Sequence, residues 1–257
     1  MSQPTLTEQI GLDDEVVCVT GGAGGIGTAI GETVAELGAD VALADVDLAG
    51  ARENAEALEE KYGVNALAVE TDVSSYPEAE AMVETVADEL GPIDVLVNNA
   101  GIASNQRFAD TDPGDWETWI GVALFGTLNC THAVIPSMVA RGRGTIVNFA
   151  SGSYRGNDPG LAVYGAAKAA NVSFTKTIAK EVGPDGVRVN CVSPGTVRTP
   201  ATEDWLDAHE DTIAKSYALE RVGEPEDVAN VVALLAGEAT GWVTGEVVHV
   251  DGGYLRR

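Results

Sequence analysis

The sequence predicts an α/β fold: a doubly wound, seven-stranded parallel sheet with helices on both faces, in a single domain over residues 1–257. Apolar, β-branched runs alternate with helical patterns from one end of the chain to the other. These runs are almost continuously apolar, as strands covered on both faces should be. The first run, EVVCVT (15–20), leads through a glycine-rich turn directly into a helix.

The seven predicted strands are these apolar runs, each followed by turn residues or by the start of a helix. In order they are EVVCVT (15–20), VALAD (41–45), NALAVET (65–71), IDVLVNNA (93–100), GTIVNFAS (144–151), GVRVNCVSP (186–194) and GEVVHVDGG (245–253). Right-handed crossovers between parallel strands place the loops that follow the strands along one edge of the sheet, where such folds bind ligands.

The helices are predicted from start and stop signals between the strands. Gly38 closes the first, which runs from about Gly25 to Leu37, and Tyr62-Gly63 ends the second. The others are expected from Ser75-Tyr76-Pro77 to Leu90, from about Asp112 to Ala140, around Tyr164 and Lys168, and from about Pro225 to Ala236. The irregular stretch of roughly 195–220 is a candidate substrate lid, because long loops in compact domains are usually functional.

Composition limits the class of protein. A chain of 257 residues with 45% hydrophobic content can bury one sizeable core. No stretch reaches about 18 uninterrupted apolar residues, so no membrane span is expected. The start, MSQPTLTEQIGLDDE, lacks the basic and apolar segments of a signal peptide. Cys18, Cys130 and Cys191 are widely separated among apolar neighbours, which predicts buried free thiols in a reducing cytoplasm.

The charge balance is strongly acidic: 40 Asp and Glu stand against 15 Lys and Arg, a net charge of −25. Nucleic-acid backbones and anionic membranes would be repelled, so neither is expected as a partner. The carboxylates are dispersed along the chain and lysine is scarce. This pattern favours a surface adapted to high salt, where screening removes the self-repulsion, over a generally acidic mesophile protein.

The segment VYGAAK (163–168) places Tyr164 and Lys168 one helical turn apart, so both project from the same face of a helix. Only Gly and Ala separate them, which leaves that face open to close approach. A free phenol titrates at about 10, too high for a base at neutral pH, but a nearby ammonium lowers the phenol pKa. By itself the spacing also fits an ordinary helix face.

The glycine-rich turn TGGAGGIG (20–27) suits a dinucleotide, since its small residues let a pyrophosphate approach the backbone N–H groups at the helix start. Asp45 ends the second strand, where its carboxylate can accept hydrogen bonds from the adenosine ribose hydroxyls. The same charge would repel a 2′-phosphate, which favours NAD over NADP. The alternative is that Asp45 is simply the N-cap of the next helix.

Together and in this order, the motifs resemble the short-chain dehydrogenase/reductase family, in its shorter single-domain branch with a Rossmann fold. TGGAGGIG is similar to the family's TGxxxGxG turn, and NNAG (98–101) to the segment beside the adenosine ribose. Asp72-Val73 matches the acidic dipeptide that holds the adenine, and SPGTVRT (193–199) the segment that binds the nicotinamide carboxamide. The resemblance implies that NAD is bound by Gly21, Gly25, Ile26, Gly27, Asp45, Asp72, Val73, Asn98, Tyr164, Lys168, Val197 and Thr199.

The resemblance also implies a catalytic set of Ser151, Tyr164 and Lys168, because Ser151 stands at the family's usual distance before the tyrosine. Tyr164 would take the hydroxyl proton as a hydride leaves for NAD, or would give a proton in reduction. Ser151 would hydrogen-bond the same oxygen and place its carbon over the nicotinamide. Lys168 would lower the pKa of the tyrosine and hold the nicotinamide ribose.

One position departs from the family's pattern. VALFG (122–126) has Ala123 where the family usually has an asparagine, which is thought to position a water that relays protons to the lysine. Asn129, six residues on, would point away by roughly 240° and is not expected to replace it. The completeness of the proton relay is therefore open.

Other polar and aromatic residues are assigned no part in the chemistry. The three histidines show no metal spacing, so no metal is expected; they are His132, His209 and His249. Asn148, inside the fifth strand, is expected to be structural. Packing or contact with another subunit is expected of Trp116, Trp119 and Trp242. Trp205 and Tyr154 are candidates for the substrate pocket.

The predicted function is hydride transfer between NAD(H) and a small secondary alcohol, polyol or sugar, or the matching ketone. One alternative is a 3-oxoacyl thioester reductase, whose usual NADPH preference conflicts with Asp45 and whose acidic carrier protein this surface would repel. The other is a catalytically weakened, NAD-binding regulatory protein, suggested by Ala123. The resemblance also implies a homotetramer in which long helices and C-terminal segments pair.

Overall fold

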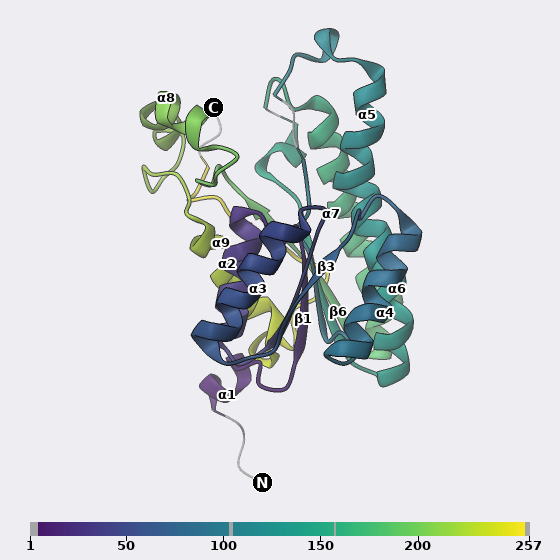
Figure 1. The fold of residues 1–257 in the computed structure, drawn as a ribbon. Helices are drawn as coiled ribbons and strands as arrows, with labels where there is room; N and C mark the ends of the chain where they lie inside the picture. Colours follow the sequence, from purple (N-terminus) through teal and green to yellow (C-terminus); the bar gives the residue numbers. More distant parts are fainter. Residues whose placement is uncertain (1–4, 103–104, 157, 255–257) are drawn as a thin grey trace.

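The computed structural model describes residues 5–102, 105–156 and 158–254, and it confirms the predicted fold (Figure 1). One parallel sheet has the strand order β3-β2-β1-β4-β5-β6-β7. The strand bounds are β1 (Val16–Thr20), β2 (Asp40–Asp45), β3 (Ala66–Glu70), β4 (Val95–Asn98), β5 (Gly144–Phe149), β6 (Val187–Pro194) and β7 (Val247–Val250). The order reverses between β1 and β4, and ligands of such sheets bind outside the carboxyl ends of the strands at that point.

Helices cover both faces of the sheet. One layer consists of α2 (Gly25–Glu36), α3 (Leu48–Tyr62) and α9 (Pro225–Ala236), and the other of α4 (Tyr76–Glu89), α6 (Gly126–Arg141) and α7 (Ala162–Val182). Shorter elements precede strands at the amino edge: α1 (Leu6–Ile10), η4 (Gly183–Asp185) and η5 (Glu238–Thr240). Others follow strands at the carboxyl edge: η1 (Phe108–Asp110), α5 (Pro113–Ile120), η3 (Gly152–Arg155) and α8 (Glu203–Ala214).

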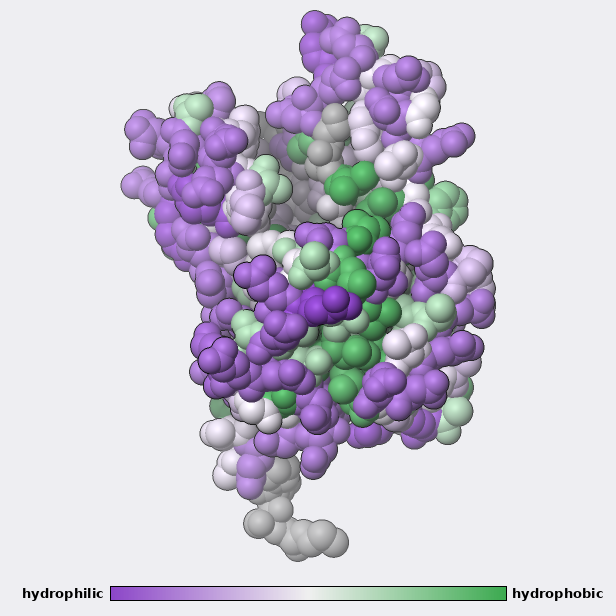
Figure 2. Space-filling model, viewed as in Figure 1, coloured by the Kyte–Doolittle hydropathy of each residue, from purple (hydrophilic) through white to green (hydrophobic). Residues whose placement is uncertain are grey.

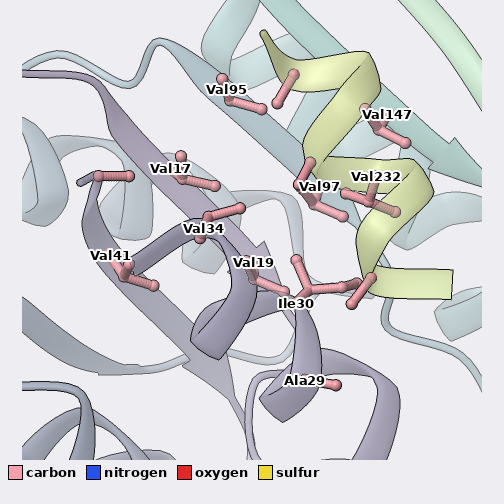
Figure 3. Packing of buried hydrophobic residues seen from close by; sticks show 14 of the residues in the cluster. Val17, Val19, Ala29, Ile30, Val34, Val41, Val95, Val97, Val147 and Val232 are labelled. Atoms are coloured by element: carbon pink, nitrogen blue, oxygen red, sulfur yellow. The ribbon is translucent and has the colours of Figure 1, made fainter. Parts of the chain in front are cut away.

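The core has two layers because successive strand residues point to opposite faces of the sheet. Val17 and Val19 of β1 pack toward α2 and α9, whereas Cys18 between them joins the other layer (Figure 3). On α2, Ile30 and Val34 occupy the facing positions, one turn apart, and are fully buried. Each such side chain contributes about 1.5–3 kcal/mol by its removal from water. The continuous apolar runs are thus strands covered on both faces, as predicted.

The stretch of 195–220, predicted to be irregular, contains the twelve-residue helix α8. Its sequence, EDWLDAHEDTIA, carries five acidic residues and buries a single residue, Leu206. Acidic residues in its first turn suit the positive end of the helix dipole. The expectation of a loop was wrong because this helix is mostly exposed and its few apolar residues form only a narrow face.

The long helix predicted for 112–140 is interrupted. A π-helical turn, η2 (Gly121–Phe125), lies between α5 and α6 and contains Ala123, the position where the family's asparagine is missing. Length and composition alone would allow the combined Pro113–Arg141 helix to cross a membrane. In this fold, however, its polar side chains bond neighbouring elements: Asn129 donates to the Val73 carbonyl oxygen at 2.9 Å.

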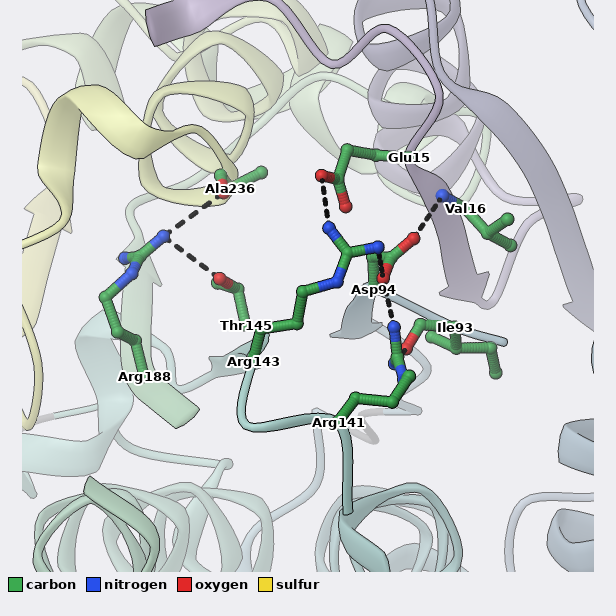
Figure 4. A network of polar contacts seen from close by, with 9 residues as sticks. All are labelled: Glu15, Val16, Ile93, Asp94, Arg141, Arg143, Thr145, Arg188 and Ala236. Atoms are coloured by element: carbon green, nitrogen blue, oxygen red, sulfur yellow. Dashed lines mark hydrogen bonds and ion pairs between the residues drawn. The ribbon is translucent and has the colours of Figure 1, made fainter. Parts of the chain in front are cut away.

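A network of charges ties the strands together at the amino edge (Figure 4). Asp94, directly before β4, is 5% exposed and accepts a hydrogen bond from the Val16 N–H at 3.1 Å. Its carboxylate also pairs with Arg141 and, at 2.9 Å, with Arg143. Arg143 in turn reaches Glu15 at 3.2 Å. This carboxylate therefore joins the starts of β1 and β4 to the loop between α6 and β5.

Candidate functional site

The glycine-rich turn forms a cradle at the carboxyl end of β1. Gly21 has a left-handed φ of +70°, and a Cβ on Gly27 would lie 2.0 Å from the Gly21 carbonyl oxygen, so no side chain fits there. In the part of the chain that the structure describes, no side chain caps the start of α2. The N–H groups of Gly25, Ile26 and Gly27 are thus available to an anion. The cradle fits the pyrophosphate of a dinucleotide.

Asp45 lies beside this cradle at the end of β2. Its carboxylate accepts hydrogen bonds from the Ala23 N–H and the Asp47 N–H, both at 3.0 Å. The next helix, α3, is capped instead by Asp47, whose side chain accepts from the Gly50 N–H. The N-cap alternative for Asp45 is therefore not what the structure contains. Asp45 is half-buried and is held beside the glycine cradle by the turn itself.

Two residues predicted to contact the adenine and its ribose, Asp72 and Asn98, lie in different environments. The Asp72 carboxylate accepts from the Ser74 N–H at 2.9 Å in an exposed turn after β3. Asn98, by contrast, is 2% exposed, and its amide donates into the interior, to Thr131 at 3.0 Å and Asn148 at 2.9 Å. Strand alternation turns the Asn98 side chain away from the cleft, and a contact between Asn98 and the cofactor stays a prediction.

The next residue, Asn99, is the one that contacts the glycine turn. Its amide donates to the carbonyl oxygens of Thr20 at 2.9 Å and Gly21 at 3.2 Å. The sequence analysis named Asn98, and not Asn99, for this edge of the cleft. The period of two along a strand was the available signal, since the residue after a buried Asn98 faces the opposite side.

The segment after β6 lies against the start of α2. A Cβ on Gly25 would be 3.1 Å from Thr199 Cβ, so the segment predicted to hold the nicotinamide adjoins the glycine cradle. The Thr199 hydroxyl lies 3.1 Å from the hydroxyl of Thr202, and Val197 is buried in a short bridge to Gly223. Two segments 174 residues apart in sequence thus form one wall of the cleft.

Ser151, Tyr164 and Lys168 meet at the carboxyl edge of β5. Ser151 follows that strand and begins η3, where its hydroxyl accepts from the Ser153 N–H at 3.3 Å. A Cβ on Gly165 would lie 2.8 Å from the Ser153 carbonyl oxygen, so glycine lets η3 approach α7 closely. The Ser151 side chain consequently lies close enough to the Tyr164 hydroxyl to lower its pKa. The Lys168 ammonium lies 5.6 Å from the centroid of the Tyr164 ring.

The electrostatics of this trio differ from the sequence-based expectation. We expected the Lys168 ammonium to lower the Tyr164 pKa, but burial raises the pKa of this phenol and the Ser151 side chain lowers it only in part. Burial also lowers the pKa of Lys168 to about 8, with the Cys191 thiol acting weakly in the opposite direction. Lys168 is 2% exposed. At neutral pH this lysine therefore remains an ammonium, but burial, and not its charge, sets the direction of the Tyr164 pKa.

The two residues suggested for a substrate pocket belong to separate clusters. The Tyr154 hydroxyl lies 3.0 Å from His249 Nε2 and accepts from Arg155 Nε at 3.1 Å. Trp205, on α8, is 43% exposed and stacks on His209 with ring centroids 5.5 Å apart. Figure 2 shows a hollow between the α8 side and the α5 side of the molecule, above the carboxyl ends of the strands.

The remaining sequence expectations concern structural residues and metals. Asn148 is fully buried and bonds Asn98 and Thr175, which confirms its structural role. Trp116 stacks on Phe108 at 5.2 Å, a packing role as expected, whereas Trp242 is fully exposed. The three cysteines are free and buried. Across residues 5–102, 105–156 and 158–254, no three His, Cys, Asp or Glu side chains gather as metal ligands would.

The chain is similar to known oxidoreductases over nearly its whole length. Residues 21–255 match the model of a family described as enoyl-(acyl carrier protein) reductase. The 3-oxoacyl-[acyl-carrier-protein] reductase FabG of Staphylococcus epidermidis is 37% identical over 238 residues, which are 91% of this chain and 96% of the relative.

Two solved structures superpose closely and differ in their cofactor. The L-sorbose reductase of Gluconobacter frateurii, complexed with NADPH and L-sorbose, matches with a TM-score of 0.91 and 31% identity, over 97% of this chain and 99% of that one. A xylitol dehydrogenase bound to NAD⁺ matches with a TM-score of 0.89 and 28% identity, over 94% and 99% respectively.

Proposed function

This chain belongs to the short-chain dehydrogenase/reductase family, and we propose that it transfers a hydride between NAD(H) and a small secondary alcohol, polyol or sugar, or the matching ketone. The observation that supports the proposal is the meeting of Ser151, Tyr164 and Lys168 at the strand edge that also holds the glycine cradle. NAD, when bound there, supplies the hydride acceptor.

The three side chains have distinct tasks in this proposal. Tyr164 exchanges the proton of the substrate hydroxyl, because its own hydroxyl is the acidic group at the centre of the trio. Ser151 donates to the same substrate oxygen and orients the reacting carbon. Lys168 contributes positive charge where the phenolate forms. Lys168 is buried and the other two side chains are half-buried, which strengthens these interactions relative to water.

The preference for NAD rests on Asp45. Its carboxylate is fixed by two backbone N–H groups beside the cradle, so it cannot swing away from a cofactor without losing both hydrogen bonds. Ribose hydroxyls can donate to it, whereas a 2′-phosphate would meet a like charge. Since one similar structure contains NADPH and another NAD⁺, similarity does not decide the cofactor, and this local charge is the argument for NAD.

A 3-oxoacyl thioester reductase is the second candidate, favoured by the 37% identical relative. Asp45 and the net charge of −25 count against NADPH and against an acidic carrier protein. A weakened NAD-binding regulatory protein is the third candidate, suggested by Ala123. The intact Ser151, Tyr164 and Lys168 count against that third candidate, because cofactor binding alone does not require all three.

The test is a screen of secondary alcohols, polyols, sugars, ketones and 3-oxoacyl thioesters for NAD(H)- or NADP(H)-coupled absorbance change, at low and at multimolar salt. We expect turnover of alcohols or ketones with NAD(H). Turnover of thioesters alone with NADPH would instead establish the second candidate. Tight NAD binding without turnover of any compound would establish the third.

We also propose that the enzyme is a cytoplasmic homotetramer with a salt-adapted acidic surface. Large apolar side chains are exposed on several elements, including Phe108 at 55%, Phe125 at 52% and Trp242 at 100%. A pairing of the α5–α6 and α7 helices, and of the β7 ends, would cover them. Light scattering at high salt tests the assembly, and a monomer there would contradict it.

A further inference from the structure

Asn171 is a buried amide that the sequence analysis did not single out. It lies on α7, three residues after Lys168, and is 0% exposed. Its Nδ2 donates to the Ala123 carbonyl oxygen at 2.9 Å, to the Phe149 carbonyl oxygen at 3.2 Å and to the Thr127 hydroxyl at 3.3 Å. One side chain thus joins α7, the π turn and the end of β5, the three elements around the catalytic trio.

The other end of this amide has no partner. Asn171 Oδ1 is buried and accepts no hydrogen bond within the described part of the chain. Exchanging the two ends would not help, because the carbonyl oxygens of Ala123 and Phe149 need a donor and would then face an oxygen. A buried acceptor without a donor costs about 1–3 kcal/mol, so such atoms usually bind a water.

Asn171 is on the side of α7 that bears the trio. Residues three and seven apart on a helix share a face, which places Asn171 in one stripe with Lys168 and Tyr164. Lys168 is also buried, and the titratable groups that face it are Tyr164 on α7 and Cys191 on β6. Ala123, fully buried opposite Asn171, has only a methyl group. A water there has an acceptor and a donor within reach.

We propose that Asn171 is a positioning residue that takes the place of the missing asparagine at position 123, its Nδ2 fixing the π turn and its Oδ1 holding a water that exchanges protons with the Lys168 ammonium. The inference rests on the proposed function. In alcohol oxidation, the proton that Tyr164 takes leaves the cleft by way of Lys168 and this water. The water passes one proton to solvent for each that it receives and is itself unchanged.

This assignment changes what is expected of Ala123→Asn. The sequence alone suggests that the substitution raises kcat by restoring a relay. With Asn171 in place, the relay is already complete, so the single substitution is expected to leave kcat within about twofold. The same substitution becomes beneficial only when Asn171 is removed.

The kinetic test compares Asn171→Leu with Thr175→Val, which removes another fully buried polar group on α7 that contacts Asn148 and not Ala123. We expect Asn171→Leu to lower kcat about tenfold at unchanged KM, because the variant loses one hydrogen-bonded path for the proton. Its solvent deuterium isotope effect should increase and the acid limb of its pH–rate profile should move. Asn171→Ala should show the same loss and Ala123→Asn/Asn171→Ala should recover most of it, while Thr175→Val changes neither kcat nor the profile.

A second test needs neither a substrate nor a cofactor. The chain has five lysines, so ε-¹³C-lysine labelling gives five NMR signals, and Lys168→Arg identifies the buried one. Asn171→Leu should lower the Lys168 pKa by about one unit further, because the ammonium loses its water. Thr175→Val should not. If the leucine variant does not fold, Asn171→Ser is measured instead and should show a shift in the same direction.

The outcomes are distinguishable. An unchanged Lys168 pKa in a folded Asn171→Leu or Asn171→Ser protein contradicts the water, whatever the enzyme does. A kcat loss that the double variant does not recover, with no change in isotope effect, shows that Asn171 only supports packing. If Tyr164→Phe retains full activity, the proposed function fails instead, and the NMR titration still decides whether Asn171 and Lys168 are coupled.

Discussion

The two ends of the central strands differ in how a buried charge is compensated. At the amino edge, before β4, Asp94 is 5% exposed and is satisfied by two arginines and the Val16 N–H. At the carboxyl edge, Lys168 is 2% exposed, and its lowered pKa reflects burial with no carboxylate contribution among the described residues. The same sheet thus has a neutralised charge at one end and an uncompensated charge at the other.

This difference assigns one buried charge to stability of the fold and the other to the reaction. A buried ion that is fully paired and hydrogen-bonded holds elements in register, and losing one partner is costly. A buried ammonium without an anion destabilises the folded chain and persists only where its charge is useful, as at a site that must stabilise a developing negative charge. The carboxyl edge is therefore expected to respond to mutation in activity, and the amino edge in free energy of unfolding.

The largest expected effect is at the carboxyl edge. Tyr164→Phe should reduce kcat by roughly 10²–10⁴-fold, because it removes the group that exchanges the substrate proton. Steady-state kinetics with NAD(H), together with NAD binding by calorimetry, measure this loss and show that the cleft stays intact. Tyr76→Phe is the matched control, since that hydroxyl lies on the surface beside Glu80 and His132. If Tyr164→Phe were as active as the wild type, the assignment of the chemistry to the carboxyl edge of the sheet would be wrong.

The amino edge is tested by Asp94→Asn. We expect a loss of roughly 3–5 kcal/mol in the free energy of unfolding, because two arginines are left without their buried carboxylate. Chemical denaturation at fixed high salt measures it. The control is Glu32→Gln, which breaks an exposed pair with Lys61 at 3.3 Å and should cost less than about 1 kcal/mol. A marked fall in kcat of the folded Asp94→Asn protein would show that the two edges are not independent.

Lys168→Met sharpens the contrast, since it should abolish turnover and yet stabilise the chain. The Lys168 pKa is about 8 in the folded protein and about 10.5 in the unfolded chain, so below pH 8 the folded state retains a penalised charge. Wild-type stability should therefore rise between pH 8 and 10.5, as the folded state loses the proton first.

The methionine variant lacks that rise. At pH 7 it should be more stable by on the order of 2–3 kcal/mol, and the two proteins should converge above about pH 10.5. Denaturation curves across this range measure the difference, with Lys176→Met, an exposed position on the same helix, as the control. A variant less stable than wild type at pH 7 would mean that the buried charge is compensated after all.

The smallest expected effect concerns Asp45. Asp45→Ser should reduce the preference for NAD(H) over NADP(H) about tenfold, since it removes one acceptor and the charge opposed to a 2′-phosphate. Cofactor titrations of both variants measure the ratio. Asp47→Ser removes an equal charge two residues away while keeping a capping oxygen on α3. An equal shift in Asp47→Ser would mean that the general acidity of the chain sets the preference, and not the position of Asp45.

Local pattern was sufficient for much of this molecule. The apolar runs located all seven strands within a few residues, because strands covered on both faces are predominantly apolar. Gly63 has a left-handed φ of +73° directly after α3, the conformation for which glycine was expected at that end. The spacing of Tyr164 and Lys168 likewise placed both on one helix face, since helical periodicity is a property of the chain itself.

Tertiary packing decided the rest. Sequence spacing could not show that η3 approaches Gly165 closely enough for Ser151 to reach Tyr164, nor that Asn98 turns inward while Asn99 contacts the glycine turn. The direction of the Tyr164 pKa shift was predicted wrongly, because desolvation depends on everything packed around a group and not on its neighbour along the helix. Asn171 reaches Ala123 across 48 residues of sequence. Such contacts arise only when separate elements are pressed together, so the sequence determined the fold and the reacting side chains, and the packing determined their environment.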